Sequence, residues 1–191
     1  MATINNLGIG FQSNSLMTFG APAQANTRVT TTTDISGFDA ARIKTLTVAE
    51  VAALTTDQVR AMSPDQVASL STTQVVALTT AQVGAMSTGQ LNGLSSEQIA
   101  ALSTDQLAAL STAQVVAITT QAIEGLSSTA MSSLSTAQLS ALTTGQVAAL
   151  SVEQMQSITA TALPSMTTAQ VASLSDAQLG AFSGQQWAAL N

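Results

Sequence analysis

The side chains that could carry out chemistry in this chain are carboxylates, hydroxyls and a few basic groups. There are ten aspartates and glutamates and four lysines and arginines, but no histidine and no cysteine. A serine or threonine nucleophile needs a neighbouring base, and no such base accompanies any of the many hydroxyls. No glycine-rich phosphate loop and no metal-binding loop is present. We therefore expect a protein without catalytic residues, metal ligands or cofactor, and not an enzyme.

Charge is scarce and unevenly distributed along the chain. Charged residues make up 7% of the sequence, and the net charge is −6. The basic residues are Arg28, Arg42, Lys44 and Arg60, and every charge beyond them is negative. A chain with so few cations offers nothing to nucleic acid or to anionic lipid. Polar residues interrupt every apolar stretch, so we also expect no insertion into a membrane.

The hydroxyls belong to an eight-residue unit that repeats eighteen times from Leu46 onward without insertion or deletion. The unit reads apolar, Ser/Thr, any, any, Gln, apolar, any, small, as in residues 110–117. Positions one and six are always large apolar residues, and position eight is always Ala, Gly or Ser. Position five is glutamine in fourteen units. Such a period indicates an extended repeat architecture.

The octad predicts a short capped helix. Ser/Thr at position two and Gln at position five form a capping box, and the apolar residues at positions one and six have the spacing of a hydrophobic staple. Glu50 supplies the equivalent acceptor in the first unit, and Pro64 lies at the first helical position, where proline is favoured. Helices of about six residues are unstable alone, so positions one and six must point into a shared core.

Two other periodic folds compete with this interpretation. In one continuous helix, eight residues advance about 80° beyond two full turns, so the apolar residues would spiral around the axis. A β-solenoid is the open alternative, because Thr, Val and Leu favour strands. The fold class we expect is an all-α solenoid with one very short helix per octapeptide.

The sequence divides into two regions. Residues 1–37 are rich in Thr, Asn, Ser and Gly and predict an N-terminal arm or tail, or a cap on the first turn, in which residues 28–35 could form a strand. Residues 38–191 form the repeat region, which begins with a divergent unit at Phe38. Within it, Pro164 falls late in its octad and predicts a local irregularity.

Aromatic residues mark the end of the array. Phe182 and Trp187 occupy positions one and six of the last unit, and Leu190 follows in register. Solenoids usually end in a polar cap that prevents stacking. We therefore predict an end-to-end contact in which Phe182, Trp187 and Leu190 of one copy meet the Phe38 end of another.

The run from Leu102 to Val115 resembles octapeptide arrays of large bacterial secreted and surface proteins that are described as adhesin-like. This resemblance implies an extracellular or cell-surface setting, and the absence of an N-terminal signal pattern implies a leaderless export route. We expect a self-assembling structural protein, a homopolymer that forms a filament or surface layer by head-to-tail stacking. The alternative is an adhesin-type binding module or a stalk segment.

Overall fold

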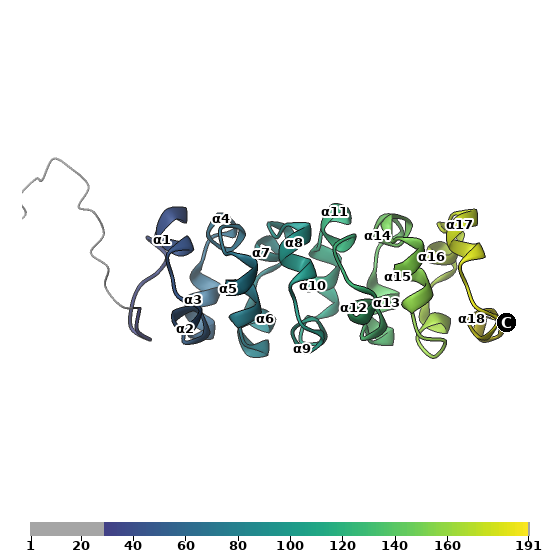
Figure 1. The fold of residues 1–191 in the computed structure, drawn as a ribbon, viewed down its shortest axis with the longest axis horizontal. Helices are drawn as coiled ribbons and strands as arrows, with labels where there is room; N and C mark the ends of the chain where they lie inside the picture. Colours follow the sequence, from purple (N-terminus) through teal and green to yellow (C-terminus); the bar gives the residue numbers. More distant parts are fainter. Residues whose placement is uncertain (1–28, 191) are drawn as a thin grey trace, which may run out of the picture.

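The computed structural model describes residues 29–190, which form one elongated rod of short helices (Figure 1). The helices are α1 (Ala40–Lys44), α2 (Val48–Ala52), α3 (Thr56–Ala61), α4 (Pro64–Ala68), α5 (Thr72–Ala77), α6 (Thr80–Ala85), α7 (Thr88–Asn92), α8 (Ser96–Ala100), α9 (Thr104–Ala108), α10 (Thr112–Ala117), α11 (Thr120–Ile123), α12 (Ser128–Ser132), α13 (Thr136–Ala141), α14 (Thr144–Ala149), α15 (Val152–Ser157), the 3-10 helix η1 (Leu163–Ser165), α16 (Thr168–Ala172), α17 (Asp176–Gly180) and α18 (Gly184–Leu190). The predicted all-α solenoid is confirmed. The β-solenoid alternative is wrong, because residues 29–190 contain no strand.

The helices of the octads that carry glutamine or glutamate at position five begin at the capping box that the sequence predicts. In α4, the Ser63 hydroxyl accepts the Gln66 amide at 3.2 Å, and the Gln66 side chain accepts the Ser63 amide at 2.7 Å. The N-cap residue itself is extended, with φ −71° and ψ 158° at Ser63. This conformation breaks the preceding helix and redirects the chain, and it recurs with the octad. A regularly repeated bend of this kind winds the chain into a superhelix.

One turn of the superhelix contains about three octads. The helices that pack on one another are three units apart in the chain, as in α2 with α5, α3 with α6 and α4 with α7. The successive turns stack along the axis of the rod, and the first and last helices lie at its opposite ends (Figure 1). Each interior helix therefore receives its tertiary contacts from the turns before and after its own.

The core is a continuous column of side chains from positions one and six. Position-six residues of interior units, such as Val67 and Leu91, are completely buried, and position-one residues such as Leu70 and Leu94 are only 4–5% exposed. These residues belong to one hydrophobic cluster that runs the length of the rod. The predicted inward orientation of both positions is confirmed.

The predicted irregularity at Pro164 is also confirmed. The octad that contains this proline forms only the 3-10 helix η1, where other octads form an α-helix. A proline in the last turn removes an amide donor and clashes with the preceding turn of an α-helix. The neighbouring octads resume the regular pattern in α15 and α16.

The segment ahead of the first helix folds differently from the strand that its sequence suggests. Of the proposed strand, residues 29–35 are described, and they form turns and irregular structure. The Asp34 carboxylate accepts hydrogen bonds from the amide and hydroxyl of Ser36 and so closes a turn. Val29 and Ile35 are buried in the hydrophobic core. The strand prediction is wrong because local turn bonds and packing on the first helices outweigh β-propensity.

Candidate functional site

The glutamines at position five form a buried polar ladder along the rod. All fourteen have exposed fractions of 8% or less. In each, Oε1 accepts the N-cap amide of its own helix, as the sequence predicts. The other half of the carboxamide points to the preceding turn, where Nε2 donates to the carbonyl 28 residues earlier at 2.6–2.9 Å. One side chain therefore completes a helix cap and joins two superhelical turns.

This second role of the glutamines was missed in the sequence analysis. A capping box needs only an acceptor at its third helical position, and glutamate serves as well as glutamine there. The sequence uses glutamine fourteen times and glutamate once. That bias was the available signal, because only the amide can accept and donate at the same time.

Three octads carry alanine at the position of the ladder glutamine. The amides of Ala122, Ala130 and Ala162 still donate to the hydroxyl at position two of their octads, but these residues provide no cross-turn donor. In the first of these octads the helix α11 has only four residues. A Cβ atom added at Gly125 would overlap the backbone of Ser96, so the two turns lie especially close there. Close backbone contact thus replaces the polar bridge at this point.

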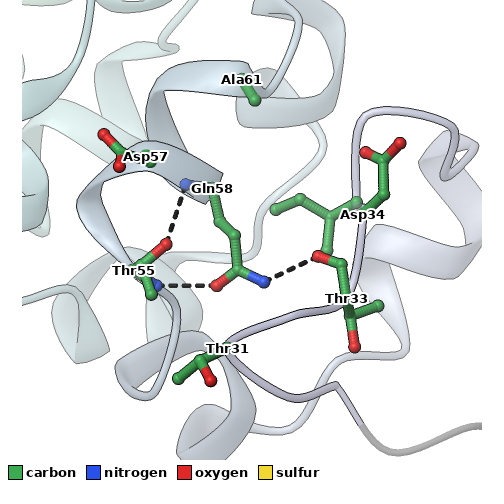
Figure 2. A pocket seen from close by; sticks show the side chains of 8 residues that line it. Thr31, Thr33, Asp34, Thr55, Asp57, Gln58 and Ala61 are labelled. Atoms are coloured by element: carbon green, nitrogen blue, oxygen red, sulfur yellow. Dashed lines mark hydrogen bonds between the residues drawn. The ribbon is translucent and has the colours of Figure 1, made fainter.

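At the N-terminal end, the ladder binds the irregular segment Val29–Phe38, which we call the plug. Gln58 Nε2 donates to the carbonyls of Thr30 at 2.8 Å and Thr33 at 2.7 Å. Figure 2 shows the Gln58 carboxamide held between Thr55 on its own helix and Thr33 on the plug. Gln66 Nε2 donates to the carbonyl of Phe38 at 2.6 Å. The plug therefore occupies the place of a preceding turn.

Glu50 is the one acidic member of the ladder, and it lies at the end of the rod that carries the plug. Its carboxylate accepts the amide and hydroxyl of Thr47, both at 2.9 Å, and the amide of Val29 at 3.2 Å. The hydrogen bonds from Thr47 hold the pKa of Glu50 below its ordinary value. Where the interior glutamines donate to the preceding turn, Glu50 accepts a hydrogen bond from it.

A groove of about 370 Å³ lies between the plug and α3, and Asp34, Asp57 and Thr31 are among its lining residues (Figure 2). Both carboxylates already have partners. Hydrogen bonds from Ser36 hold the pKa of Asp34 below its ordinary value, and Asp57 pairs with Arg60 at 2.9 Å. Within residues 29–190, no three histidine, cysteine or acidic residues come together to hold a metal ion.

The C-terminal end is more open than the N-terminal end. Position-six residues are buried through Leu163, but Val171 and Leu179 are half-buried and Trp187 is 42% exposed. Trp187 packs edge-on against Phe182, with ring centroids 5.6 Å apart. A groove of about 380 Å³ adjoins Trp187. Its other lining residues are Pro164, Met166, Thr168, Val171, Ala189 and Leu190.

The four residues predicted to make the end contact are divided between the two ends of the rod. Phe182, Trp187 and Leu190 lie together at the C-terminal end. Phe182 is buried, whereas Leu190 is half-buried against the core. Phe38 lies at the opposite end, half-buried, with the Arg42 guanidinium 5.4 Å from its ring centroid. Their contact between copies stays a prediction.

The fold and the ladder define an α-helical repeat solenoid. Comparison with known families agrees, since the model of the ALTTAQ repeat matches residues 58–88, 80–112 and 115–152. Residues 77–82 of the chain spell this motif letter for letter. No curated protein and no solved structure matches the chain. The chain is thus similar to this repeat family over its central octads.

Proposed function

We propose that this repeat protein is a structural subunit that assembles with copies of itself by head-to-tail stacking, as a filament or a surface layer. The observation that carries the proposal is the partly uncovered apolar surface at the C-terminal end of residues 29–190. There Val171, Leu179 and Trp187 are partly exposed, although the same octad position is buried throughout the interior. In the interior, a further turn of octads covers that position. A second copy of the chain could supply the same kind of apolar octad turn to cover Val171, Leu179 and Trp187.

The shape of the rod favours an open polymer. Its two ends differ in structure and lie far apart along the axis (Figure 1). A contact between two different surfaces is heterologous, and it produces a filament when successive rotations do not close a ring. A rod whose ends meet along its own axis leaves no room for ring closure with few subunits.

The chemistry of the surface supports a homopolymer with no nucleic acid partner and no catalytic role. The side of the rod is lined with hydroxyls, alanines and a few carboxylates, and the basic residues of the described part lie within the first three helices. Among residues 29–190, no helix is long and apolar enough to cross a membrane. We propose that the assembly lies outside the bacterial cell or on its surface.

A binding module or stalk segment is the second candidate function. Two apolar side chains at position seven, Val76 and Val116, are 55% and 42% exposed on the side of the rod. Such residues could contact a partner laterally. Residues 61–181 contain no aromatic residue and no arginine, which are the types that dominate binding energy at interfaces.

Light scattering coupled to gel filtration, together with negative-stain microscopy over a range of concentrations, tests the proposal. We expect filaments whose length grows with concentration and which the Trp187→Ala substitution abolishes. Val76→Ala is the matched control, because it removes an exposed apolar side chain away from the ends and should leave assembly unchanged. A rod that stays strictly monomeric at every concentration, also when the bonds of residues 29–38 are weakened by Glu50→Gln, would refute self-assembly and favour the binding module or stalk.

A further inference from the structure

We propose that the plug, Val29–Phe38, is a removable substitute for a superhelical turn, and that the C-terminal turn of a second copy replaces it when the rods join. This inference rests on the proposed self-assembly and specifies its mechanism. It assigns an interaction surface, the N-terminal face of the first octads, and one occupant for that surface. The plug then blocks assembly until it leaves.

The plug imitates a turn in both register and bonding. Ile35 lies sixteen residues before Val51, which is two octads, and it is buried to the same degree as position-six residues. Gln66 donates to carbonyls 31, 30 and 28 residues earlier, at 3.0, 3.0 and 2.6 Å. Gln82, in the regular array, donates at the same three separations, at 3.1, 3.4 and 2.6 Å. The first octads therefore make the same hydrogen bonds and apolar contacts with the plug as interior octads make with a preceding turn.

The C-terminal turn presents the complementary groups. The carbonyls that ladder glutamines bind belong to position one, which in this turn is Met166, Leu174 and Phe182. Within residues 29–190, no glutamine donates to these three carbonyls, and the ladder ends with Gln186 bonded to Ile158. The half-buried position-six residues stand beside them. A second copy that offers Gln58 and Gln66 would supply both the donors and the apolar cover that interior turns receive.

Glu50 makes the N-terminal face prefer the plug to an octad turn. A ladder glutamine at this position would donate to a carbonyl of the incoming turn, but an ionised carboxylate only accepts. The plug meets this requirement by presenting the Val29 amide. An octad turn would bring carbonyl oxygens to the carboxylate and would be repelled. Assembly must therefore overcome both the bonds of the plug and this mismatch.

The experiment compares the concentration for half-assembly of the full chain with that of the Glu50→Gln variant. The substitution removes the acceptor of the Val29 amide and supplies a donor for the incoming turn, so we expect this concentration to fall about tenfold or more. Glu153→Gln is the matched control, because Glu153 is an exposed carboxylate in the interior and does not face either end. Circular dichroism checks that each variant keeps its helices.

Three further measurements identify the plug and its replacement. Ile35→Ala removes the buried side chain of the plug and should lower the half-assembly concentration in the same direction. A synthetic peptide of residues 29–38, added in excess, should slow assembly of the Glu50→Gln variant by competing for the vacated face. Trp187→Ala combined with Glu50→Gln should restore the monomer, because the C-terminal turn of the second copy then lacks its largest apolar side chain.

The outcomes separate this inference from the proposed function. If the natural chain assembles and Glu50→Gln assembles no more readily, self-assembly stands and the plug mechanism is overturned. If Glu50→Gln assembles where the natural chain does not, the plug mechanism is supported and self-assembly depends on its release. If the variant that combines Glu50→Gln with Trp187→Ala still forms filaments, the C-terminal turn is not what replaces the plug. If neither chain assembles, both proposals fail.

Discussion

The buried glutamine ladder leads to a sharp prediction at Gln90 in the middle of the rod. Gln90 is 1% exposed, accepts the Ser87 amide at 2.7 Å, and donates to the carbonyls of Val59 and Met62, each at 2.7 Å. Gln90→Ala leaves the Ser87 amide and the Met62 carbonyl without their partner. At about 1–3 kcal/mol for each buried group, we expect the free energy of unfolding to fall by about 3 kcal/mol. This loss should not depend on pH.

Gln90→Glu should behave differently, because the introduced carboxyl keeps the cap but faces two carbonyl oxygens. When protonated, it still accepts the Ser87 amide and can donate one hydrogen bond, so the loss in acid is only about 1 kcal/mol. When ionised, it is repelled by both carbonyls in a buried site, so its folded-state pKa lies above the unfolded value of about 4.3. The variant is therefore most stable below that value and loses stability as pH rises toward the folded-state pKa.

The added loss has an upper limit, because the folded protein can keep the introduced carboxyl protonated. At pH 7 this costs at most 1.36 kcal/mol for each pH unit above 4.3, or about 3.7 kcal/mol. The total loss at pH 7 is then up to about 5 kcal/mol. Gln90→Glu should thus be more stable than Gln90→Ala near pH 4 and less stable near pH 7.

Urea denaturation followed by circular dichroism between pH 4 and pH 8 measures this reversal. Ionisable groups shared by the two variants cancel in the difference between them. Gln121→Glu is the control, since Gln121 is exposed and outside the ladder, and its substitution should change stability by about 0.5 kcal/mol or less. Parallel stability curves for the two Gln90 variants would refute the donor role of the ladder.

Three further predictions concern positions where the ladder or the close packing of turns changes. Ala130→Gln adds the missing cross-turn donor and should raise stability by about 1 kcal/mol, measured as a higher melting temperature; an unchanged value would contradict the idea that the carboxamide site is intact there. Gly125→Ala should destabilise the rod by about 2 kcal/mol or more, because its Cβ would overlap the backbone of the preceding turn. Gly180→Ala, whose Cβ meets nothing within 4 Å, should be neutral or slightly stabilising. The hydrogen bonds from Thr47 hold the pKa of Glu50 below its ordinary value, so the contribution of Glu50 to stability is present above the unfolded-state pKa and is lost as pH falls through the folded-state pKa. Hydrogen exchange at the Val29 amide, corrected for intrinsic rates, should therefore quicken in strong acid, and exchange that stays constant from pH 7 down to about pH 2 would show that Glu50 does not hold the plug.

The local structure of each octad could be predicted because its causes lie within a few residues. The capping box joins residues three apart, such as Ser63 and Gln66, and the staple joins residues five apart. Both the start of each helix and the inward direction of positions one and six follow from these pairs. The change at Pro164 was predictable for the same reason, since its effect is confined to one octad.

The bond from Gln66 to Phe38 could not be predicted in the same way. It joins atoms 28 residues apart, and which carbonyl lies opposite a glutamine depends on how many octads complete a turn. The number of octads in a turn is set by the backbone angles between successive helices. The octad pattern limits these angles to an allowed region but does not fix their values. The conformation of the plug could not be predicted because Thr30–Thr33 resembles a strand in composition, whereas the segment is held by hydrogen bonds to Gln58, Gln66 and Glu50.

The ladder also explains why so many weak helices form a stable rod. A helix of five or six residues does not persist alone in water. In the fourteen octads that carry the ladder, the glutamine that completes the helix cap is itself held by a carbonyl of the preceding turn, so capping and stacking occur together. The hydrogen bonds between turns all run in one direction, since the glutamine donors point toward the N-terminus and the carbonyl acceptors point toward the C-terminus. A rod built in this way has two chemically different ends, because its glutamine donors face the N-terminal end, where the plug accepts them, and its position-one carbonyls face the C-terminal end.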